Sequence, residues 1–463
     1  MTTDHDATEA VVNRDDLVTW LEAGCTPRDA WRIGTEHEKF GFHRDTLQPL
    51  EYDGPRGIRA MLERMAEQFG WRLVYEKGLP IALERDGAGI TLEPGGQIEL
   101  SGAPLRTIHE TQTEINTHLE QLAQVCRGLE MAFIGIGAQP RWPFEAIPWM
   151  PKGRYGVMQE YLPTRGDRAL DMMARTCTVQ ANLDFESEAD MVRKFRLSLA
   201  IQPLVTALFA NSPFMEGKST GDLSHRARIW HHTDPDRCGW LPFVFEEGFG
   251  FERYVDYALD VPMFFAYRDG RYIHAKGAPF RAFMEGRLPV LEGERPTLDD
   301  WVLHLSTLFP DVRLKRYLEM RGADVGNSST LCALPALWKG LLHDDDALEA
   351  VWERVRDWQP EHRERMHREV PKRGLTTTTP GGETFQELAM TVLEAARGGL
   401  HRIGCQNDDG CDESIYLDPL FLTVESGKTP AHRLLDAFEK RWNGSVDPVF
   451  QEEEFESFIA RCT

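Results

Sequence analysis

Glutamate residues occur in closely spaced pairs at two places in the sequence, and this spacing can serve chemistry. Glu36 and Glu38 lie two residues apart within residues 34–40, and Glu93 and Glu99 flank a Pro-Gly-Gly sequence. Side chains two residues apart in an extended strand point to the same face. A hairpin that turns at Pro-Gly-Gly would also bring Glu93 near Glu99. The spacing therefore predicts carboxylates gathered on one face of neighbouring strands.

Two further segments predicted as strands carry polar groups on one face. Residues 178–185 alternate apolar side chains with the polar set Gln180, Asn182 and Asp184. Residues 317–322 place Glu319 and Arg321 on one face, and apolar side chains on the other. Such faces can be the solvated sides of half-buried strands. The alternative is that all four segments point their polar faces into one shared concave site.

A shared site of this kind would require cations. Clustered carboxylates shielded from water repel one another, and each buried charge costs several kcal/mol unless it is compensated. Glutamate and glutamine offer only oxygen ligands, which favour Mg²⁺ or Mn²⁺ over zinc. Mg²⁺ in proteins usually lies beside substrate phosphates. The four segments therefore predict metal-assisted phosphoryl transfer on a β-sheet.

The elements that must position these strands include several predicted helices. Residues 104–130 place apolar side chains along one helical stripe. Ser187, close to a capping box, predicts the start of a helix over residues 187–210. Helices are also expected over residues 345–358 and 428–442. Strands and helices do not follow a strict βαβ rhythm, which favours an α+β fold with an antiparallel sheet.

The composition excludes several classes of protein. The 463 residues are 41% hydrophobic and 27% charged, which is typical of a globular protein. The formal net charge of −22 argues against nucleic-acid binding, since such a protein needs a basic surface. The longest apolar run, about residues 197–210, is too short and too broken to span a membrane.

The cysteines and the N-terminal sequence bear on the compartment. The eight cysteines include no CxxC pair, so we expect no zinc site and mostly free thiols in a reducing compartment. The first residues are acidic and resemble neither a secretory signal nor a transit peptide. We therefore expect a cytoplasmic protein. No linker divides the chain, so we expect one catalytic domain over residues 1–463, with a core at 30–345 and a mainly helical part at 346–463.

At these same segments the sequence resembles the glutamate–cysteine ligases of the plant and proteobacterial type. The matching stretches include GTEHEKFGF from Gly34, TLEPGGQIELSGAP from Thr91, PKGRYGVM from Pro151, DMMARTCTVQANLDF from Asp171, ALFANSPFMEGK from Ala207 and FPDVRLKRYLEMRGAD from Phe309. The matches keep their order from residue 34 to about 345. Length and order make the resemblance far more specific than a short motif.

The resemblance implies a fold and a reaction. The implied fold is like the catalytic fold of glutamine synthetase, with a curved antiparallel sheet that forms a funnel and with helices outside it. In the implied reaction, ATP phosphorylates the γ-carboxylate of glutamate. The cysteine amine then displaces phosphate to give γ-glutamylcysteine, the first step of glutathione biosynthesis. Plant members carry a transit segment that is absent here, which also favours a bacterial cytosolic protein.

The resemblance also implies roles for individual residues. The implied Mg²⁺ ligands are Glu36, Glu38, Glu93, Glu99 and Glu319, together with Gln180, which stands where more distant relatives place a histidine. Arg154 and Arg321 are implied to clamp the transferring phosphoryl group, with Arg154 also contacting substrate. Arg226 is implied to receive the α-carboxylate of glutamate. A guanidinium group can form two parallel hydrogen bonds with a carboxylate or a phosphate, which agrees with these roles.

Two other functions remain open alongside this ligase. One is a related carboxylate–amine ligase that activates glutamate but uses a different amine. The other is a metal or nucleotide sensor on the same scaffold, without catalysis. We expect small-molecule partners only, namely glutamate, cysteine and ATP, with neither nucleic acid nor membrane, and either a monomer or a homodimer.

Overall fold

The computed structural model describes residues 13–455 of the chain. The expectation that the chain has no leader segment rests mainly on residues 1–12, which lie outside the described residues. No helix within residues 13–455 is long and apolar enough to cross a membrane. Cys25, Cys177, Cys238, Cys332, Cys405 and Cys411 are free thiols, as expected.

The centre of the molecule is a nine-stranded sheet in which neighbouring strands run antiparallel. The strand order is β14-β15-β7-β1-β5-β4-β3-β2, and β6 also pairs with β1. The strands are β1 Ile33–His43, β2 Arg72–Glu76, β3 Leu79–Arg85, β4 Ala88–Leu92, β5 Ile98–Ser101, β6 Met131–Ile134, β7 Thr178–Leu183, β14 Val312–Leu314 and β15 Leu318–Asp324. The sheet and its helices confirm the predicted α+β class.

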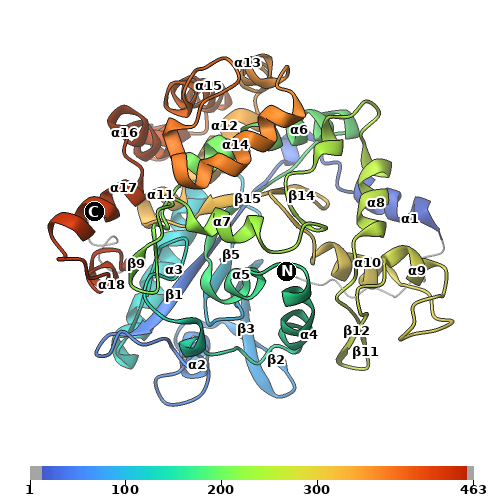
Figure 1. The fold of residues 1–463 in the computed structure, drawn as a ribbon, viewed down its shortest axis with the longest axis horizontal. Coiled ribbons are helices and arrows are strands. Elements are labelled where there is room, and N and C mark those ends of the chain that lie inside the picture. The colour runs from blue at the N-terminus through green and yellow to red at the C-terminus, as the bar shows by residue number, and fades with distance from the viewer. Residues whose placement is uncertain (1–12, 456–463) are drawn as a thin grey trace.

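Strand pairing brings the predicted polar faces together. The long strand β1 crosses the middle of the molecule (Figure 1) and lies between β7 and β5. Glu36 is opposite Gln180 of β7, and Glu38 is opposite Glu99 of β5. Glu319 of β15 is opposite Asn182, which also belongs to β7. The register therefore places polar residues from four strands side by side on one face of the sheet.

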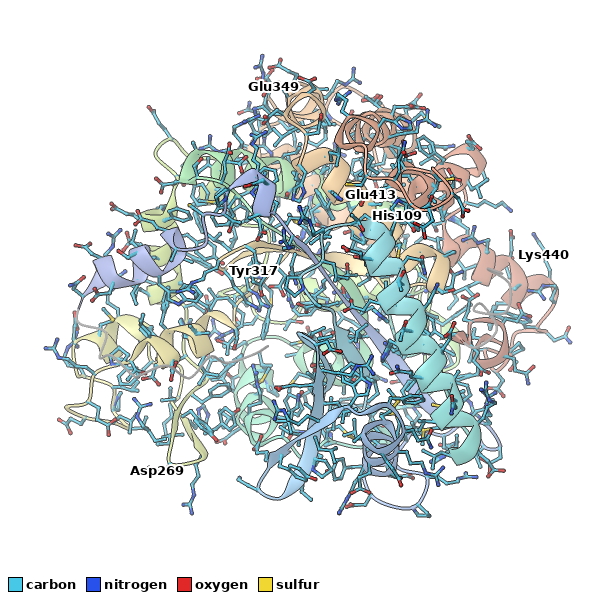
Figure 2. The ribbon with its side chains drawn as sticks, turned by 180° about the vertical axis from the view of Figure 1, so that it is seen from behind. His109, Asp269, Tyr317, Glu349, Glu413 and Lys440 are labelled. Carbon is cyan, nitrogen blue, oxygen red and sulfur yellow. The ribbon has the colours of Figure 1, made fainter. Side chains whose placement is uncertain are left out.

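Helices surround this sheet. They are α1 Arg14–Glu22, α2 Ile58–Phe69, α3 Ile108–Leu129, α4 Gly153–Tyr161, α5 Ala169–Arg175, α6 Glu188–Leu208, α7 His225–His231, α8 Phe251–Asp260, α9 Phe280–Met284, α10 Leu298–Leu305, α11 Ser328–Leu331, α12 Ala333–Leu342, α13 Asp345–Val355, α14 Pro360–Arg373, α15 Phe385–Ile403, α16 Asp418–Ser426, α17 Pro430–Lys440 and α18 Val449–Glu452. Helices α5 and α7 lie in front of the sheet in Figure 1, whereas α3 runs across its back in Figure 2.

Short strand pairs and single helical turns complete the fold. The pairs are β8 Phe214–Met215 with β9 Lys218–Ser219, β10 Cys238–Gly239 with β13 Phe309–Pro310, and β11 Phe265–Arg268 with β12 Arg271–His274. Only the pair β10–β13 is parallel among these three. The 3-10 turns are η1 Arg28–Ala30, η2 Phe144–Ala146, η3 Leu162–Thr164, η4 Pro242–Phe245, η5 Gly374–Thr376 and η6 Glu413–Leu417.

The four helices predicted from the sequence are present, with small shifts at their ends. The helix expected over residues 104–130 is α3, which begins after a capping box formed by Thr107 and Glu110. It ends at Leu129, and the next residue, Glu130, takes a left-handed conformation with φ 55°. Helix α6 begins after Ser187, whose hydroxyl accepts a hydrogen bond from the Asp190 amide. The other two are α13 and α17.

One hydrophobic core holds the molecule together. Its buried residues extend from Leu17 to Phe455 and include side chains from the sheet and from the C-terminal helices. Leu318 and Met320, on the apolar face of β15, are almost fully buried, as their alternation predicts. The C-terminal helices α13–α17 lie at the top and upper left of Figure 1, and α13, α15 and α16 contact both α12 and α6. The polar face of the sheet is thus backed by a continuous apolar layer.

Candidate active site

The polar face of the sheet forms the floor of a large cavity of about 630 Å³. We call this cavity the basin. It is lined by all nine residues that the sequence predicted for the site: Glu36, Glu38, Glu93, Glu99, Gln180, Glu319, Arg154, Arg226 and Arg321. The alternative that these strands expose separate polar faces to solvent is therefore wrong.

Four of the carboxylates line the basin from strand β1 and from the β4–β5 hairpin. The Asn182 side-chain amide donates to Glu36 Oε1 at 2.9 Å. The backbone amide of Thr178 donates to Glu38 Oε2 at 2.8 Å, which fixes Glu38 against β7. Glu93 and Glu99 enter from the β4–β5 hairpin, where the backbone amide of Glu93 donates to the Gln97 carbonyl at 2.9 Å. The predicted hairpin is therefore present, and it positions two of these four carboxylates.

These four carboxylates carry a charge that their surroundings disfavour. Burial raises the pKa of Glu36, and the nearby charges of Glu319 and Glu99 raise it further. Burial also raises the pKa of Glu38 well above its ordinary value, with added repulsion from Glu93 and Glu99. The pKa values of Glu93 and Glu99 are raised for the same first reason, burial. Such a cluster is stabilised as anions only when cations enter the basin.

Glu319 differs from the other four carboxylates because it is already paired with cations. Arg313 donates to both of its oxygens, to Oε1 at 2.8 Å, and Lys315 Nζ lies 3.7 Å from Oε2. Burial alone would raise the pKa of Glu319, but the charges of Arg313, Lys315 and Arg321 outweigh it and lower that pKa. The cross-strand pair Arg313–Glu319 explains this, since β14 and β15 are neighbours. Glu319 is thus an anion without any metal.

Arg321 is held in the basin by two of the predicted ligands. Its Nη1 donates to Gln180 Oε1 at 2.7 Å and to Glu319 Oε1 at 3.2 Å. Its Nε is buried and has no hydrogen-bond partner among residues 13–455. In this arrangement Gln180 and Glu319 orient a guanidinium group that keeps one N–H available for an anion.

Arg154 enters the basin from the first turn of α4. The backbone amide of Gly153 donates to Glu76 Oε1 at 2.8 Å, which ties the start of α4 to strand β2. The Arg154 guanidinium lies 5.6 Å from the centre of the Phe265 ring. Its Nε is buried and lacks a partner within the described residues. Arg154 therefore presents a positive charge and an unsatisfied donor to the basin.

Arg226 enters from α7 on the side nearest Glu38. Its backbone amide donates to Ser212 Oγ at 3.1 Å, and its Nη2 donates to the Arg321 carbonyl at 3.0 Å. The side chain is 3% exposed, and burial lowers the pKa of its guanidinium. Its Nε also lacks a partner among residues 13–455. Buried N–H groups without acceptors are rare in proteins, and this one is a donor that an anionic ligand could use.

Sequence reasoning missed several basin residues with charge. They are Arg32, Lys152, Arg313 and Lys315. Arg313 and Lys315 stand four and two residues before Tyr317, so the alternation that identified Glu319 and Arg321 continues into them. Lys152 precedes a helix and has no such signal, and its Nζ donates to the Leu92 carbonyl at 2.7 Å. Figure 2 shows Tyr317 near the middle of the molecule, at the turn between β14 and β15.

The side chains of the basin fit a metal ion whose coordination is completed by oxygens of the substrate. No group of three or more His, Cys, Asp or Glu side chains in residues 13–455 is arranged to hold a metal ion by itself. Mg²⁺ usually keeps one or two protein carboxylates and takes further oxygens from substrate phosphates and water. Paired carboxylates facing unsatisfied guanidinium donors suit such a shared complex. The donor set is all oxygen, which agrees with Mg²⁺ or Mn²⁺ rather than zinc.

Comparison with known proteins identifies the family. The model of glutamate-cysteine ligase family 2 (GCS2) matches residues 32–452. The chain belongs to this ligase family. It is 53% identical to the chloroplastic glutamate–cysteine ligase B of Oryza sativa over 95% of this chain and 87% of the relative. It is also 53% identical to the chloroplastic enzyme of Arabidopsis thaliana, over 96% and 83%. The resemblance seen in the sequence is confirmed, and with it the assignment as a glutamate–cysteine ligase.

A solved structure shares the fold. The glutamate–cysteine ligase of Francisella tularensis in complex with AMP matches with a TM-score of 0.50 at 11% sequence identity. The match covers 93% of this chain and 91% of that one. At this identity the comparison supports the mixed α+β architecture and nothing finer.

The expectation of a cytoplasmic protein is contradicted by the comparisons. The plant relatives at 51–53% identity, from rice, Brassica juncea, Arabidopsis and tomato, are chloroplastic enzymes. That expectation rested on acidic composition, free thiols and the first residues of the chain. Acidic composition and free thiols do not distinguish one reducing aqueous compartment from another, which is why the inference failed.

Proposed function

We propose that this ligase forms γ-glutamylcysteine in the basin through a γ-glutamyl phosphate. A γ-carboxylate oxygen of glutamate attacks the terminal phosphorus of ATP, and ADP leaves. The amine of cysteine then attacks the acyl carbon, loses a proton, and phosphate leaves. The observation that carries this proposal is the face-to-face arrangement of buried carboxylates and guanidinium groups with free N–H donors. A nucleotide bound to Mg²⁺ would neutralise the carboxylates, and the phosphates and the carboxylate substrate would accept hydrogen bonds from the guanidinium groups.

We propose that Glu36, Glu38, Glu93 and Glu99 hold Mg²⁺ when the nucleotide binds. Bound Mg²⁺ would neutralise the ATP phosphates and spread the charge that develops during phosphoryl transfer. Glu319 and Gln180 also belong to the proposed Mg²⁺ ligands, but they differ from the other four in their contacts. Their oxygens already accept from Arg321, so we expect their main contribution to be the orientation of that guanidinium group.

The three arginine residues of the basin bind the anionic groups of the substrates. Arg154 and Arg321 flank the carboxylates and offer free donors to the transferring phosphoryl group, where negative charge grows in the transition state. Arg226 lies at the Glu38 end of the basin and receives the α-carboxylate of glutamate. Its guanidinium can bind a carboxylate through two hydrogen bonds, whereas a lysine would supply only a point charge.

The finer fold assignment is also part of this proposal. A curved antiparallel sheet with its polar face inward and helices outside corresponds to the funnel-shaped catalytic fold of glutamine synthetase. The wall formed by α4, α5 and α7 would close the front of such a funnel. In this arrangement the sheet supplies the carboxylates and the helices supply Arg154 and Arg226.

One assay tests the reaction. Purified protein is incubated with ATP, Mg²⁺, glutamate and cysteine, and γ-glutamylcysteine and ADP are measured with each component omitted in turn. We expect product only when all four are present. ADP release that depends on glutamate but is stimulated equally by many amines would instead support a ligase that uses a different amine. Nucleotide binding without turnover would support a sensor.

A further inference from the structure

A buried carboxylate lies behind the basin, next to the start of α7. It belongs to Asp324, the last residue of β15, which is 1% exposed and is not among the residues that line the basin. A charge taken out of water is costly unless neighbouring groups compensate for it. The partners of Asp324 therefore indicate what this carboxylate does for the site.

Three hydrogen bonds reach the Asp324 carboxylate, and all three come from segments next to α7. Its Oδ2 accepts from the Asn211 backbone amide at 2.8 Å and from the Ser212 hydroxyl at 2.6 Å. Its Oδ1 accepts from the Ser224 hydroxyl at 2.8 Å. Asn211 and Ser212 belong to the turn after α6, and Ser224 is the residue before α7. One carboxylate therefore joins the end of β15 to both segments.

The two serine hydroxyls connect this carboxylate to the first turn of α7. Ser212 Oγ donates to Asp324 and accepts from the backbone amide of Arg226 at 3.1 Å. Ser224 Oγ donates to Asp324 and accepts from the backbone amide of Ala227 at 3.2 Å, which caps the helix. Only one hydroxyl group thus separates Asp324 from the backbone of Arg226.

Asp324 also compensates the charge of Arg226 without occupying its donors. Burial lowers the pKa of the Arg226 guanidinium, and among the surrounding charges that of Asp324 opposes this effect most strongly. Within residues 13–455 the two side chains share no hydrogen bond, because the Asp324 oxygens accept from Asn211, Ser212 and Ser224 instead. Arg226 Nε consequently keeps no partner within those residues. A direct ion pair would have consumed the donors that a substrate needs.

The carboxylate itself is held in one place by the sheet. Asp324 pairs with Thr178 of β7. A Cβ added at Gly137 would lie 2.5 Å from Asp324 Cγ, so the backbone of Gly137 packs directly against the carboxylate. Asn211 Nδ2 donates to the carbonyl of Val325, the residue after β15, at 3.0 Å. The position of Asp324 is therefore fixed, and the start of α7 is placed relative to it.

We propose, on the basis of the function proposed above, that Asp324 is a positioning residue for Arg226. Its carboxylate sets the distance between the first turn of α7 and the sheet through the Ser212 hydroxyl. Its negative charge offsets the buried guanidinium of Arg226, whose donors stay free for the substrate. An asparagine of the same shape would accept through one oxygen only and would carry no charge, so it would lose both effects.

The test separates substrate binding from the amount of folded enzyme. Formation of γ-glutamylcysteine gives kcat and the KM of each substrate in wild-type protein and in Asp324→Asn. We expect the glutamate KM to rise about thirtyfold, as the loss of a hydrogen bond to a charged group typically causes, while kcat and the KM values of cysteine and ATP stay within about threefold of wild type. A purely structural role would reduce the fraction of active protein, which lowers kcat and leaves every KM unchanged. That result would overturn the proposal.

A pair of serine variants decides the question even where Asp324→Asn does not fold. Ser212→Ala removes the hydroxyl between Asp324 and Arg226, and it should raise the glutamate KM about fivefold. Ser187→Ala is the matched control, because the Ser187 hydroxyl likewise accepts from a backbone amide but lies outside the basin lining. It should lower the melting temperature and keep the wild-type glutamate KM. An unchanged KM in Ser212→Ala, or a raised one in Ser187→Ala, would overturn the proposal.

A double-variant cycle tests whether Asp324 acts through Arg226. Arg226→Lys alone should raise the glutamate KM, and Asp324→Asn added to it should raise that KM less than about threefold further, since interacting residues are not additive. Effects that multiply would show that Asp324 acts independently and would overturn the proposal. A wild-type glutamate KM in Arg226→Lys would overturn the role of Arg226, and this proposal with it. Absence of γ-glutamylcysteine with wild-type protein would show that the proposed function itself has failed.

Discussion

At the scale of single residues, the glutamates of the basin fall into two classes, which differ in the direction of their pKa shift. Glu36, Glu38, Glu93 and Glu99 have raised pKa values because of burial and mutual repulsion. Glu319 has a lowered pKa because its cationic neighbours outweigh its burial. Charge removal should therefore have opposite effects on stability in the two classes, although it should impair catalysis in both.

The first prediction concerns the unpaired class. Glu36→Gln keeps the shape of the side chain and removes a buried charge that repels Glu99 and Glu319. We expect activity to fall about a hundredfold or more, since a contact to developing charge is lost. Without divalent cations, thermal unfolding should show a melting temperature equal to or above that of wild type. A marked loss of stability in EDTA, together with full activity, would contradict the assignment.

The second prediction concerns the paired class. Glu319→Gln leaves Arg313 and Lys315 buried without their counter-charge. Loss of one partner from a buried ion pair typically costs about 3–5 kcal/mol, so denaturant unfolding should show a clearly lower stability than that of Glu36→Gln. Activity should also fall, because the carboxylate that orients Arg321 becomes a neutral amide. The comparison fails if both variants unfold at the same denaturant concentration.

At the scale of elements, the β4–β5 hairpin has to press closely against α5. A Cβ added at Gly95 would lie 2.3 Å from the Ala174 carbonyl oxygen, so the backbone leaves no room for a side chain. The following residue, Gly96, has a positive φ of 86°, which suits glycine. This hairpin carries both Glu93 and Glu99, and it is therefore the element through which α5 fixes two of the carboxylates.

The third prediction tests this contact. Gly95→Ala should push the hairpin away from α5, lower stability by about 1–3 kcal/mol as overpacking does, and reduce activity at least tenfold. Gly156→Ala is the control, since Gly156 lies inside α4 and an added Cβ meets nothing within 4 Å. That change should raise helix stability by about 0.5–1 kcal/mol and leave activity close to wild type. Urea unfolding and the product assay distinguish the two.

At the scale of the whole molecule, the apolar core stabilises the fold, whereas the carboxylate cluster of the basin opposes folding. The core runs through the described chain without interruption and excludes the basin carboxylates. The fold should therefore not depend on a bound cation, in contrast to small zinc domains that unfold without metal. The basin instead stores unfavourable charge, which only ligands relieve.

The fourth prediction follows from this separation. Removal of divalent cations with EDTA should abolish γ-glutamylcysteine formation, while far-UV circular dichroism at 25 °C stays unchanged. Restored Mg²⁺ with ATP should return activity and raise the melting temperature, because a ligand that binds only the folded state stabilises it by mass action. Unfolding of the protein on chelation would contradict the proposed arrangement.

The sequence by itself determined the features that depend on local periodicity. Alternation along a strand assigned Glu36, Glu38, Gln180 and Glu319 to polar faces, because the period of two residues is a property of the extended backbone. The Pro-Gly-Gly turn placed Glu93 near Glu99 for an equally local reason. Caps such as Ser187 located helix ends to within a few residues. The long resemblance added the family, which the comparisons confirm.

Only the tertiary structure decided which of these local features meet. The position of β1 between β7 and β5 brings the carboxylates together, and the packing of α4 and α7 adds Arg154 and Arg226. The same packing pairs Glu319 with Arg313 and sets Asp311 against His367, a residue 56 positions further along the chain. Such contacts depend on how distant segments bury their apolar faces together, and no local pattern of residues encodes that choice.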